Sequence, residues 1–276
     1  MDLIIQGIEI ETSDLRQLAK LSGASKIERI NGNAFRLIDA SQRDRISPLC
    51  LEAELDFAFV DERKSLNQFR LIAMDMDSTL VAIETIDEIA DIHGMRKQVA
   101  EITEKAMYGE IDFSEGLIQR VALLKGLEHS VLQRVYDERL IFNPGAEKML
   151  KKLKVAGIKT MLISGGFTFF TDKLKDRLGL DYTFANTLET VNGRLTGRLL
   201  GEVFGAKGKG WALNKICNEL GFRKENLIAI GDGANDLSMF AEAGVSIAYH
   251  AKPIVQENAT YAINHVGLDG VINIFQ

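Results

Sequence analysis

The stretch LIAMDMDSTLVAIETIDEIA, residues 71–90, joins a short apolar run to two aspartates and then to a helix-like segment. The run has the length and composition of a strand buried on both faces of a parallel sheet. Asp75 and Asp77 stand at its end, one residue apart, where two ionised carboxylates repel each other. A cation between them, or a proton on one of them, removes that repulsion. The stretch therefore predicts a reactive site at the end of a core strand.

Three further apolar runs have the same character: IKTMLIS (158–164), LIAIGD (227–232) and VSIAYH (245–250). Short apolar strands that alternate with helices indicate a parallel sheet covered on both faces. Residues 67–276 are therefore predicted to form an α/β domain with a Rossmann-like parallel sheet core. A run of helix-like segments at about 84–142 would form an inserted helical cap over the first strand.

Two other regions have a different pattern. Residues 182–200 alternate in polarity around Asn192-Gly193, which is typical of a β-hairpin. Residues 1–66 follow the order β-α-β-β-α-β, which predicts a small α+β domain of the ferredoxin-like kind. The polar residues 61–68 would link this domain to the α/β domain.

The composition limits the kinds of partner. A chain of 276 residues has room for two domains, and its net charge of −6 argues against nucleic acid as the main partner. Cys50 and Cys217 lack the spacing of a disulfide framework or a metal knuckle, which favours a reducing compartment. Neither a signal peptide nor an apolar run of membrane-spanning length is recognisable. We therefore expect a cytoplasmic protein without a membrane partner.

Reactive residue types follow three of the predicted strands. They are Asp75-Met76-Asp77-Ser78-Thr79, Ser164-Gly165-Gly166 and GDGAND (231–236), and Lys207 opens a helix-like segment between the last two. Ligands bind at the carboxyl ends of parallel strands, so we expect these groups to meet although they are far apart in sequence.

These side chains indicate phosphate chemistry with a metal. Asp75, Asp77 and Asp232 offer the oxygen ligands that Mg²⁺ favours, and the ion would offset the charge of a phosphate. The SGG segment offers a hydroxyl and open backbone N–H groups to an anion, and Lys207 offers a compact positive charge. An aspartate can accept a phosphoryl group, and a second carboxylic acid can protonate the leaving alcohol and then activate water.

Each motif taken alone has an ordinary structural interpretation. GDGAND can be a glycine turn, SGG a loop, and Lys207 a surface lysine. Glu84 can interact with a helix dipole, and Arg120 can pair with a surface acid. Only the order of the motifs and their position after strands favour the catalytic interpretation.

The blocks DMDST, SGG, Lys207 and GDGAND resemble, in order and spacing, the haloacid dehalogenase superfamily of phosphohydrolases. The longer segments DMDSTLVAIETIDEIA, AMYGEIDFSEGLIQRVALLKG, SGGF and GDGANDLSMFAEAG resemble the phosphoserine phosphatases within it. This resemblance covers about residues 70–276. Residues 1–66 resemble an ACT-like module, a type of domain that often binds amino acids or mediates dimers.

The resemblance implies a role for each matched residue. Asp75 would be the nucleophile, Asp77 the general acid and base, and Asp75, the backbone carbonyl of Asp77 and Asp232 would hold Mg²⁺. The phosphoryl group would be bound by Ser164, Gly165, Gly166 and Lys207, with Asn235 nearby and Asp236 orienting Lys207. In the cap, Glu84 would bind the substrate ammonium and Arg120 its carboxylate, while Met107 and Phe113 would close an apolar wall.

The sequence leaves three functions open. The first, implied by the resemblance, is hydrolysis of O-phospho-L-serine to L-serine and phosphate, the last step of serine biosynthesis. The second is the same chemistry on phosphothreonine, phosphohomoserine or a phosphoprotein, or a phosphomutase reaction. The third is an amino-acid-sensing regulatory protein whose catalytic site is secondary, in which residues 1–66 bind an amino acid or mediate a homodimer. The alternative for residues 1–66 is a structural appendage without a regulatory role.

Overall fold

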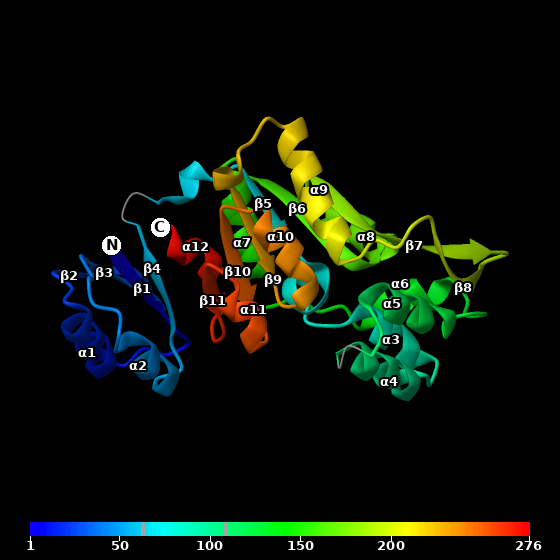
Figure 1. Ribbon diagram of the computed structural model, residues 1–276, viewed down its shortest axis with the longest axis horizontal. Helices are drawn as coiled ribbons and strands as arrows, with labels where there is room; N and C mark the ends of the chain where they lie inside the picture. The colour runs from blue at the N-terminus through cyan, green and yellow to red at the C-terminus, as the bar shows by residue number, and fades with distance from the viewer. Residues whose placement is uncertain (62–63, 108–109) are drawn as a thin grey trace.

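The computed structural model describes residues 1–61, 64–107 and 110–276. For residues 106 and 107 it describes the backbone alone. Within the described residues the strands form two sheets; the smaller lies at the left of Figure 1 and the larger lies in the middle. The larger sheet has the strand order β11-β10-β9-β5-β6-β7-β8, and the smaller has the order β2-β3-β1-β4. β5 (Leu71–Met74), which carries the opening motif, therefore lies inside the larger sheet between β9 and β6.

The larger sheet confirms the predicted Rossmann-like core. Besides β5 it contains β6 (Lys159–Phe167), β7 (Tyr182–Val191), β8 (Arg194–Leu200), β9 (Leu227–Gly231), β10 (Val245–Tyr249) and β11 (Tyr261–Ile263). The pairs from β11 to β7 are parallel, whereas β7 and β8 pair antiparallel as the predicted hairpin. All residues of β5 and β9 are buried, as expected for central strands.

Helices cover both faces of this sheet because alternate residues of each strand point to opposite sides. Leu71 and Ala73 pack with α9 (Ala206–Glu219), whereas Ile72 and Met74 belong to the core that includes the opposite helices. The remaining helices of this domain are α7 (Ala146–Val155), α8 (Thr168–Leu178), α10 (Leu237–Ala241), α11 (Pro253–Glu257) and α12 (Gly270–Ile274), with single turns at Leu66–Gln68, Lys224–Asn226 and Ala234–Asp236. No helix in the described part of the chain is both long and apolar enough to span a bilayer.

Four helices follow β5 in the sequence before the chain returns to the sheet: α3 (Thr85–Ile92), α4 (Arg96–Met107), α5 (Phe113–Ala122) and α6 (Ser130–Glu138). They lie together beside the hairpin of β7 and β8, and α5 packs against β8 (Figure 1). The chain leaves the core through the irregular turn Met76–Leu80 and returns beside it, since Ala82 N donates to Ile141 O at 2.8 Å. The two crossing segments are thus hydrogen-bonded to each other.

The smaller sheet has the predicted β-α-β-β-α-β order. Its elements are β1 (Asp2–Gln6), α1 (Thr12–Ser22), β2 (Lys26–Asn31), β3 (Ala34–Ile38), α2 (Ile46–Glu52) and β4 (Asp56–Val60). Its pairs are all antiparallel, and Leu3, Ile5, Leu18, Leu37 and Ile46 form a core of their own. The likeness to ACT modules and the division of the chain at residue 66 stay predictions.

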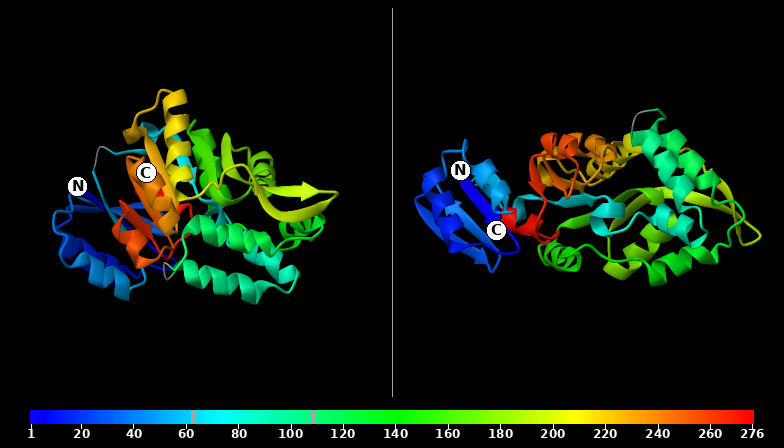
Figure 2. Two further views of the ribbon diagram at one scale, coloured as in Figure 1. Left: turned by 45° about the vertical axis from the view of Figure 1, so that its right-hand side comes forward. Right: turned by 90° about the horizontal axis from the view of Figure 1, so that it is seen from below.

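The small sheet docks on the C-terminal end of the chain, as Figure 2 shows. The buried carboxylate of Asp56 accepts hydrogen bonds from the backbone N–H groups of Asn264 at 2.6 Å, His265 at 3.0 Å and Val266 at 3.0 Å. The side chain of Asn273 donates to Gln6 Oε1 at 3.0 Å in the same junction. Separating a buried carboxylate from three backbone N–H donors costs free energy, because both sides lose their hydrogen bonds. These contacts therefore hold the small sheet in place.

Candidate active site

Asp75 lies directly beyond the end of β5 and is buried. Its Oδ1 accepts a hydrogen bond from the N–H of Met76 at 2.7 Å, and its Oδ2 lies 2.6 Å from Lys209 Nζ. Burial and the charge of Asp236 raise the pKa of Asp75 well above its usual range, whereas Lys209 acts to lower it. The ionised, nucleophilic form of Asp75 therefore depends on positive charge beside it.

Lys209, and not the predicted Lys207, is the cation of this site. Lys209 is fully buried, and its Nζ also lies 2.7 Å from Asp236 Oδ1. Burial acts to lower the pKa of Lys209, but the charges of Asp236 and Asp75 outweigh it and raise that pKa, so the side chain is charged. Lys207 is exposed at the start of α9 and is therefore a surface lysine, the ordinary interpretation given above. Asp236 accordingly orients Lys209 and not Lys207.

Asp77 lies two residues beyond Asp75 and contacts the first residue of the cap. Its Oδ1 accepts from Thr85 N at 3.0 Å, and its Oδ2 accepts from Thr85 Oγ1 at 3.3 Å. Burial, followed by the charge of Glu84, raises the pKa of Asp77 to about 8. A carboxyl group with this pKa holds a proton at neutral pH, as a general acid must.

Asp232 comes from the end of β9 and faces the same site. Its Oδ1 accepts from Thr79 Oγ1 at 2.7 Å, and burial raises its pKa to about 6. Carboxylate oxygens of Asp75, Asp232 and Asp236 all lie within 4.8 Å of one another. Both oxygens of Asp236 are engaged, one by Lys209 and the other by Gly233 N at 3.0 Å.

This carboxylate cluster fits a divalent cation. Lys209 is the basic side chain ion-paired with it among the described residues, so the cluster carries more negative than positive charge. Hard oxygen ligands in such a cluster are the donor set that Mg²⁺ prefers. Asp75, Asp232 and Asp236 each place a carboxylate oxygen where it could hold the ion. The choice of Asp75 and Asp232 as its ligands stays a prediction. The predicted role of the backbone carbonyl of Asp77 stays a prediction.

The SGG segment forms a tight wall beside Asp77. Ser164 is fully buried, and its Oγ accepts from Gly166 N at 2.8 Å. A Cβ on Gly166 would lie 2.9 Å from Asp77 Oδ2, and a Cβ on Gly165 would lie 2.8 Å from the ring of Phe113. Both glycines are therefore required by close approach, one to the acid and one to the cap.

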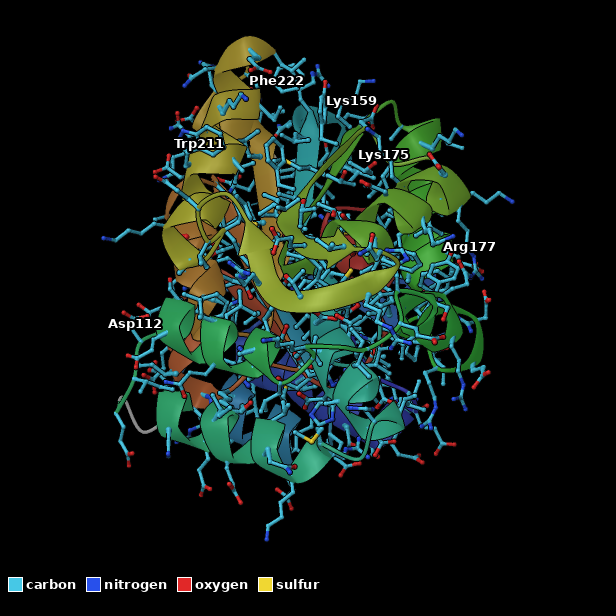
Figure 3. The ribbon with its side chains drawn as sticks, turned by 90° about the vertical axis from the view of Figure 1, so that its right-hand side faces the viewer. Asp112, Lys159, Lys175, Arg177, Trp211 and Phe222 are labelled. Atoms are coloured by element: carbon cyan, nitrogen blue, oxygen red, sulfur yellow. The ribbon has the colours of Figure 1, made fainter. Side chains whose placement is uncertain are left out.

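The cap brings further predicted residues to the mouth of the site. Phe113 packs on Gly165 and close to Gly205, and Glu84 Oε1 accepts from Ser78 Oγ at 2.6 Å. Arg120 is half-buried; burial lowers its pKa, and the charges of Asp87, Glu84 and Asp77 act in the opposite direction. Figure 3 shows this side of the molecule, with Asp112 labelled at the start of α5, the helix that carries Phe113 and Arg120.

Two predicted residues are less informative. Met107 ends α4, but its side chain is outside the described part of the chain. Asn235 is half-buried beside Gly233, on the turn that carries Asp232 and Asp236. Its proximity agrees with the predicted position, while its proposed contact with phosphate stays a prediction.

Sequence reasoning assigned no individual role to four residues that shape the site: Thr79, Thr85, Asn143 and Lys209. A signal for Lys209 was present, because Lys209 is in helical phase with the buried Ala212, Leu213 and Ile216, whereas Lys207 is not. Asn143 lies outside the four motifs of the sequence. Its Nδ2 donates to Thr79 O at 2.7 Å and, at 3.3 Å each, to Ser78 O and Val81 O, which fixes the turn after Asp77.

Several known proteins are similar to this chain in sequence. The family model for haloacid dehalogenase-like hydrolases matches residues 69–244, and that for a domain of unknown function (DUF4072) matches residues 3–46. A phosphoserine phosphatase of Polaromonas sp. is 52% identical over 214 residues, 76% of this chain and 91% of the relative. A phosphoserine phosphatase of Archaeoglobus fulgidus is 44% identical over 246 residues, 87% of this chain and 71% of the relative.

Solved structures share its fold. A probable phosphoserine phosphatase from Vibrio cholerae, in unliganded form, aligns with a TM-score of 0.87 and 37% identity over 99% of this chain and 86% of its own. A substrate-bound phosphoserine phosphatase aligns with a TM-score of 0.71 and 42% identity over 75% of this chain and 99% of its own. With a family model that spans more than half of its residues, the chain belongs to the haloacid dehalogenase-like hydrolases.

Proposed function

We propose that this chain is a Mg²⁺-dependent phosphomonoesterase that hydrolyses O-phospho-L-serine to L-serine and phosphate, the last step of serine biosynthesis. The observation that carries the proposal is the buried Asp75–Lys209 pair at 2.6 Å, with Asp77 two residues away, where burial and the charge of Glu84 raise its pKa. The phosphoserine phosphatases among its relatives support the choice of substrate.

In the first step, a carboxylate oxygen of Asp75 attacks phosphorus. The bond between phosphorus and the serine oxygen breaks, and its electron pair stays on that oxygen. Asp77 gives the oxygen its proton, so serine leaves as a neutral alcohol. The products of this step are serine, an aspartyl phosphate on Asp75 and an ionised Asp77.

In the second step, Asp77 acts as the base. It takes a proton from a water molecule, whose oxygen attacks the phosphorus of the aspartyl phosphate. The bond to the Asp75 oxygen breaks, which releases phosphate and returns Asp75 to its carboxylate form. Asp77 is then protonated again and ready for the next substrate.

Positive charge and amide donors stabilise the phosphoryl group in both steps. Lys209 would neutralise phosphoryl oxygens while Asp236 holds it in place. The hydroxyl of Ser164 and the backbone N–H of Gly165 would donate hydrogen bonds, whereas the N–H of Gly166 donates to Ser164 Oγ. Mg²⁺, held by Asp75, Asp232 and the backbone carbonyl of Asp77, would supply the further charge that a phosphate dianion requires.

The cap would select the amino acid. Glu84 would bind the ammonium group and Arg120 the carboxylate, because a zwitterion needs one anion and one bidentate cation. Phe113, together with Met107, would form the apolar wall, and its packing on Gly165 would limit the access of bulk water.

The surrounding assignments belong to the same proposal. Residues 1–66 would be a separate ACT-like domain and residues 67–276 the phosphatase domain, with the cap inserted at about 84–142. The substrate is a small molecule, and neither nucleic acid nor a membrane is proposed as a partner. A homodimer and a cytoplasmic location complete the proposal; the two free, buried cysteines agree with a reducing compartment.

A phosphate-release panel tests the function. O-phospho-L-serine, O-phosphothreonine, phosphohomoserine and a phosphopeptide would be compared with Mg²⁺ and with a chelator. We expect phosphoserine to be hydrolysed fastest, no release in the chelator, and no activity for Asp75→Asn. A preference for another phosphoester would redirect the substrate assignment, and the absence of release from every ester would favour the amino-acid-sensing alternative.

A further inference from the structure

The segment that joins the core to the cap folds back on the catalytic turn. Ser78 N donates to Ile83 O at 3.2 Å, and Ser78 Oγ donates to Glu84. Ser78 has a φ of 53°, a left-handed conformation that costs free energy in a residue other than glycine. The contacts of this segment therefore hold the turn in a shape that it would not adopt alone.

Thr85 makes the closest connection between this segment and the chemistry. It is the first residue of α3 and is fully buried, and both its N–H and its hydroxyl donate to Asp77. The two carboxyl oxygens are held differently. Oδ1 takes the N–H at 3.0 Å, while Oδ2, which takes the hydroxyl at 3.3 Å, is also the oxygen nearest the Cβ position of Gly166.

Resting on the proposed function, we propose that Thr85 is the positioning residue of the general acid. Its N–H and hydroxyl orient Asp77 so that Oδ2 faces the phosphate-binding wall and delivers its proton to the departing serine oxygen. Because Thr85 belongs to the cap and Asp77 to the core, the acid is aligned only while α3 holds its place against the catalytic turn.

The chemistry of a hydroxyl suits this role. A hydroxyl donates to an ionised carboxylate and can rotate to accept from a protonated one. Thr85 Oγ1 can therefore support Asp77 in both protonation states of the reaction. Valine has the same shape but lacks the hydroxyl, whereas serine keeps the hydroxyl and loses only a methyl group.

Helix capping explains the N–H contact, because the first N–H groups of a helix lack acceptors within it, but capping does not require the hydroxyl contact. A residue that merely begins a helix would have its side chain free or bonded to nearby backbone groups. Glu84, the N-cap of α3, makes no capping hydrogen bond with its side chain, and both donors of Thr85 point out of the helix to Asp77.

The test compares two phosphate donors that differ in their need for an acid. Serine is a poor leaving group and requires a proton, whereas the acetate of acetyl phosphate leaves without one. The rate at which Asp75 becomes phosphorylated would be measured by rapid quench in single-turnover reactions with Mg²⁺. For Thr85→Val we expect this rate to fall about tenfold to a hundredfold with phosphoserine and less than about threefold with acetyl phosphate.

Two controls keep the result interpretable. Thr85→Ser should restore most of the rate with phosphoserine. Thr171→Val changes another fully buried threonine, whose hydroxyl donates to Thr168 O within α8, and should affect neither donor. Equal slowing of both donors by Thr85→Val, or no slowing of either, would overturn the positioning role. A wild-type chain that does not hydrolyse phosphoserine would instead overturn the proposed function.

Discussion

Lys209 Nζ lies 2.6 Å from Asp75 Oδ2 inside a site where both side chains are buried. The ion pair makes the nucleophile and its cation dependent on each other. Asp236 is the second carboxylate on the same ammonium group, at 2.7 Å. Removing the lysine would leave two buried carboxylates facing each other without a counter-charge.

Lys209→Met is therefore expected to lower kcat for phosphoserine by at least about a hundredfold, because the stabilising charge at the phosphoryl group is lost. Lys207→Met, two residues away in an exposed position, should change kcat less than about twofold. Steady-state phosphate release from both variants decides the matter. The reverse order of effects would restore the assignment of Lys207.

The metal-free protein should lose stability as the pH rises. Burial raises the pKa of Asp77 to about 8 and that of Asp232 to about 6, above the value of about 3.9 for an unfolded aspartate. A carboxyl group with a raised folded-state pKa stabilises the fold below its unfolded pKa, and this contribution is lost as the pH passes through the folded pKa. In a chelator, Tm should fall between about pH 4 and pH 8.

Mg²⁺ should flatten this pH dependence, since an ion beside the carboxylates favours their ionised forms. Asp77→Asn should remove the part of the dependence nearest pH 8. Thermal unfolding at several pH values, with chelator and with Mg²⁺, checks both expectations. A Tm that is independent of pH in the chelator would contradict the raised pKa values.

Gly166→Ala should inactivate the enzyme without unfolding it. The new Cβ would lie 2.9 Å from Asp77 Oδ2 and 3.0 Å from Ser164 Oγ, so the acid or the hydroxyl must move. A misplacement of about 1 Å at a reacting group costs on the order of a hundredfold in kcat. Gly32→Ala is the matched control, because its Cβ would come no closer than 3.9 Å to Arg29, and it should keep full activity.

Arg120→Met should discriminate between substrates. If Arg120 binds the substrate carboxylate, KM for phosphoserine should rise about tenfold to a hundredfold, the cost of a lost charged hydrogen-bonded pair. Phosphoethanolamine has the ammonium and phosphate groups but no carboxylate, and its KM should stay nearly constant. An equal rise for both substrates would mean that Arg120 acts on the cap rather than on the carboxylate.

Asp56→Asn should weaken the junction between the two sheets. The amide group replaces one acceptor oxygen with a donor, which would face the N–H groups of Asn264, His265 and Val266. We expect a loss of about 2–4 kcal/mol in the free energy of unfolding, measured in urea. Asp44→Asn, at an exposed position, should leave stability unchanged. A full-stability Asp56 variant would show that the junction contributes little.

The motifs predicted the sheet and most of the site because their information is local. Asp75 and Asp232 directly follow the ends of β5 and β9, whereas Ser164 lies inside β6, which runs on to Phe167. Parallel topology brings these three positions to the same edge of the sheet. The prediction of Lys207 was wrong because α9 begins with two lysines, Lys207 and Lys209, and the motif alone does not distinguish them. Burial follows the helical face, and only Lys209 lies on the face shared with Leu213.

Contacts between distant segments were beyond the sequence. The short elements β11 and α12 carry too few residues for a periodic pattern, so their places in the fold were not predicted. The hydrogen bonds from Thr85 to Asp77 and from Asn143 to the turn depend on how the chain enters and leaves the cap. Such geometry arises from the assembled fold rather than from residue type.

The three amides held by Asp56 also bear on how this chain could be shortened. Next to them, Leu268 N donates to Pro144 O at 2.8 Å, and Pro144 directly follows Asn143, the residue that fastens the catalytic turn. Deleting the first sixty residues to obtain a minimal hydrolase would leave the backbone N–H groups of residues 264–266 without the acceptor that Asp56 provides. A replacement acceptor, grafted as a short loop or a designed carboxylate, would have to accompany the truncation.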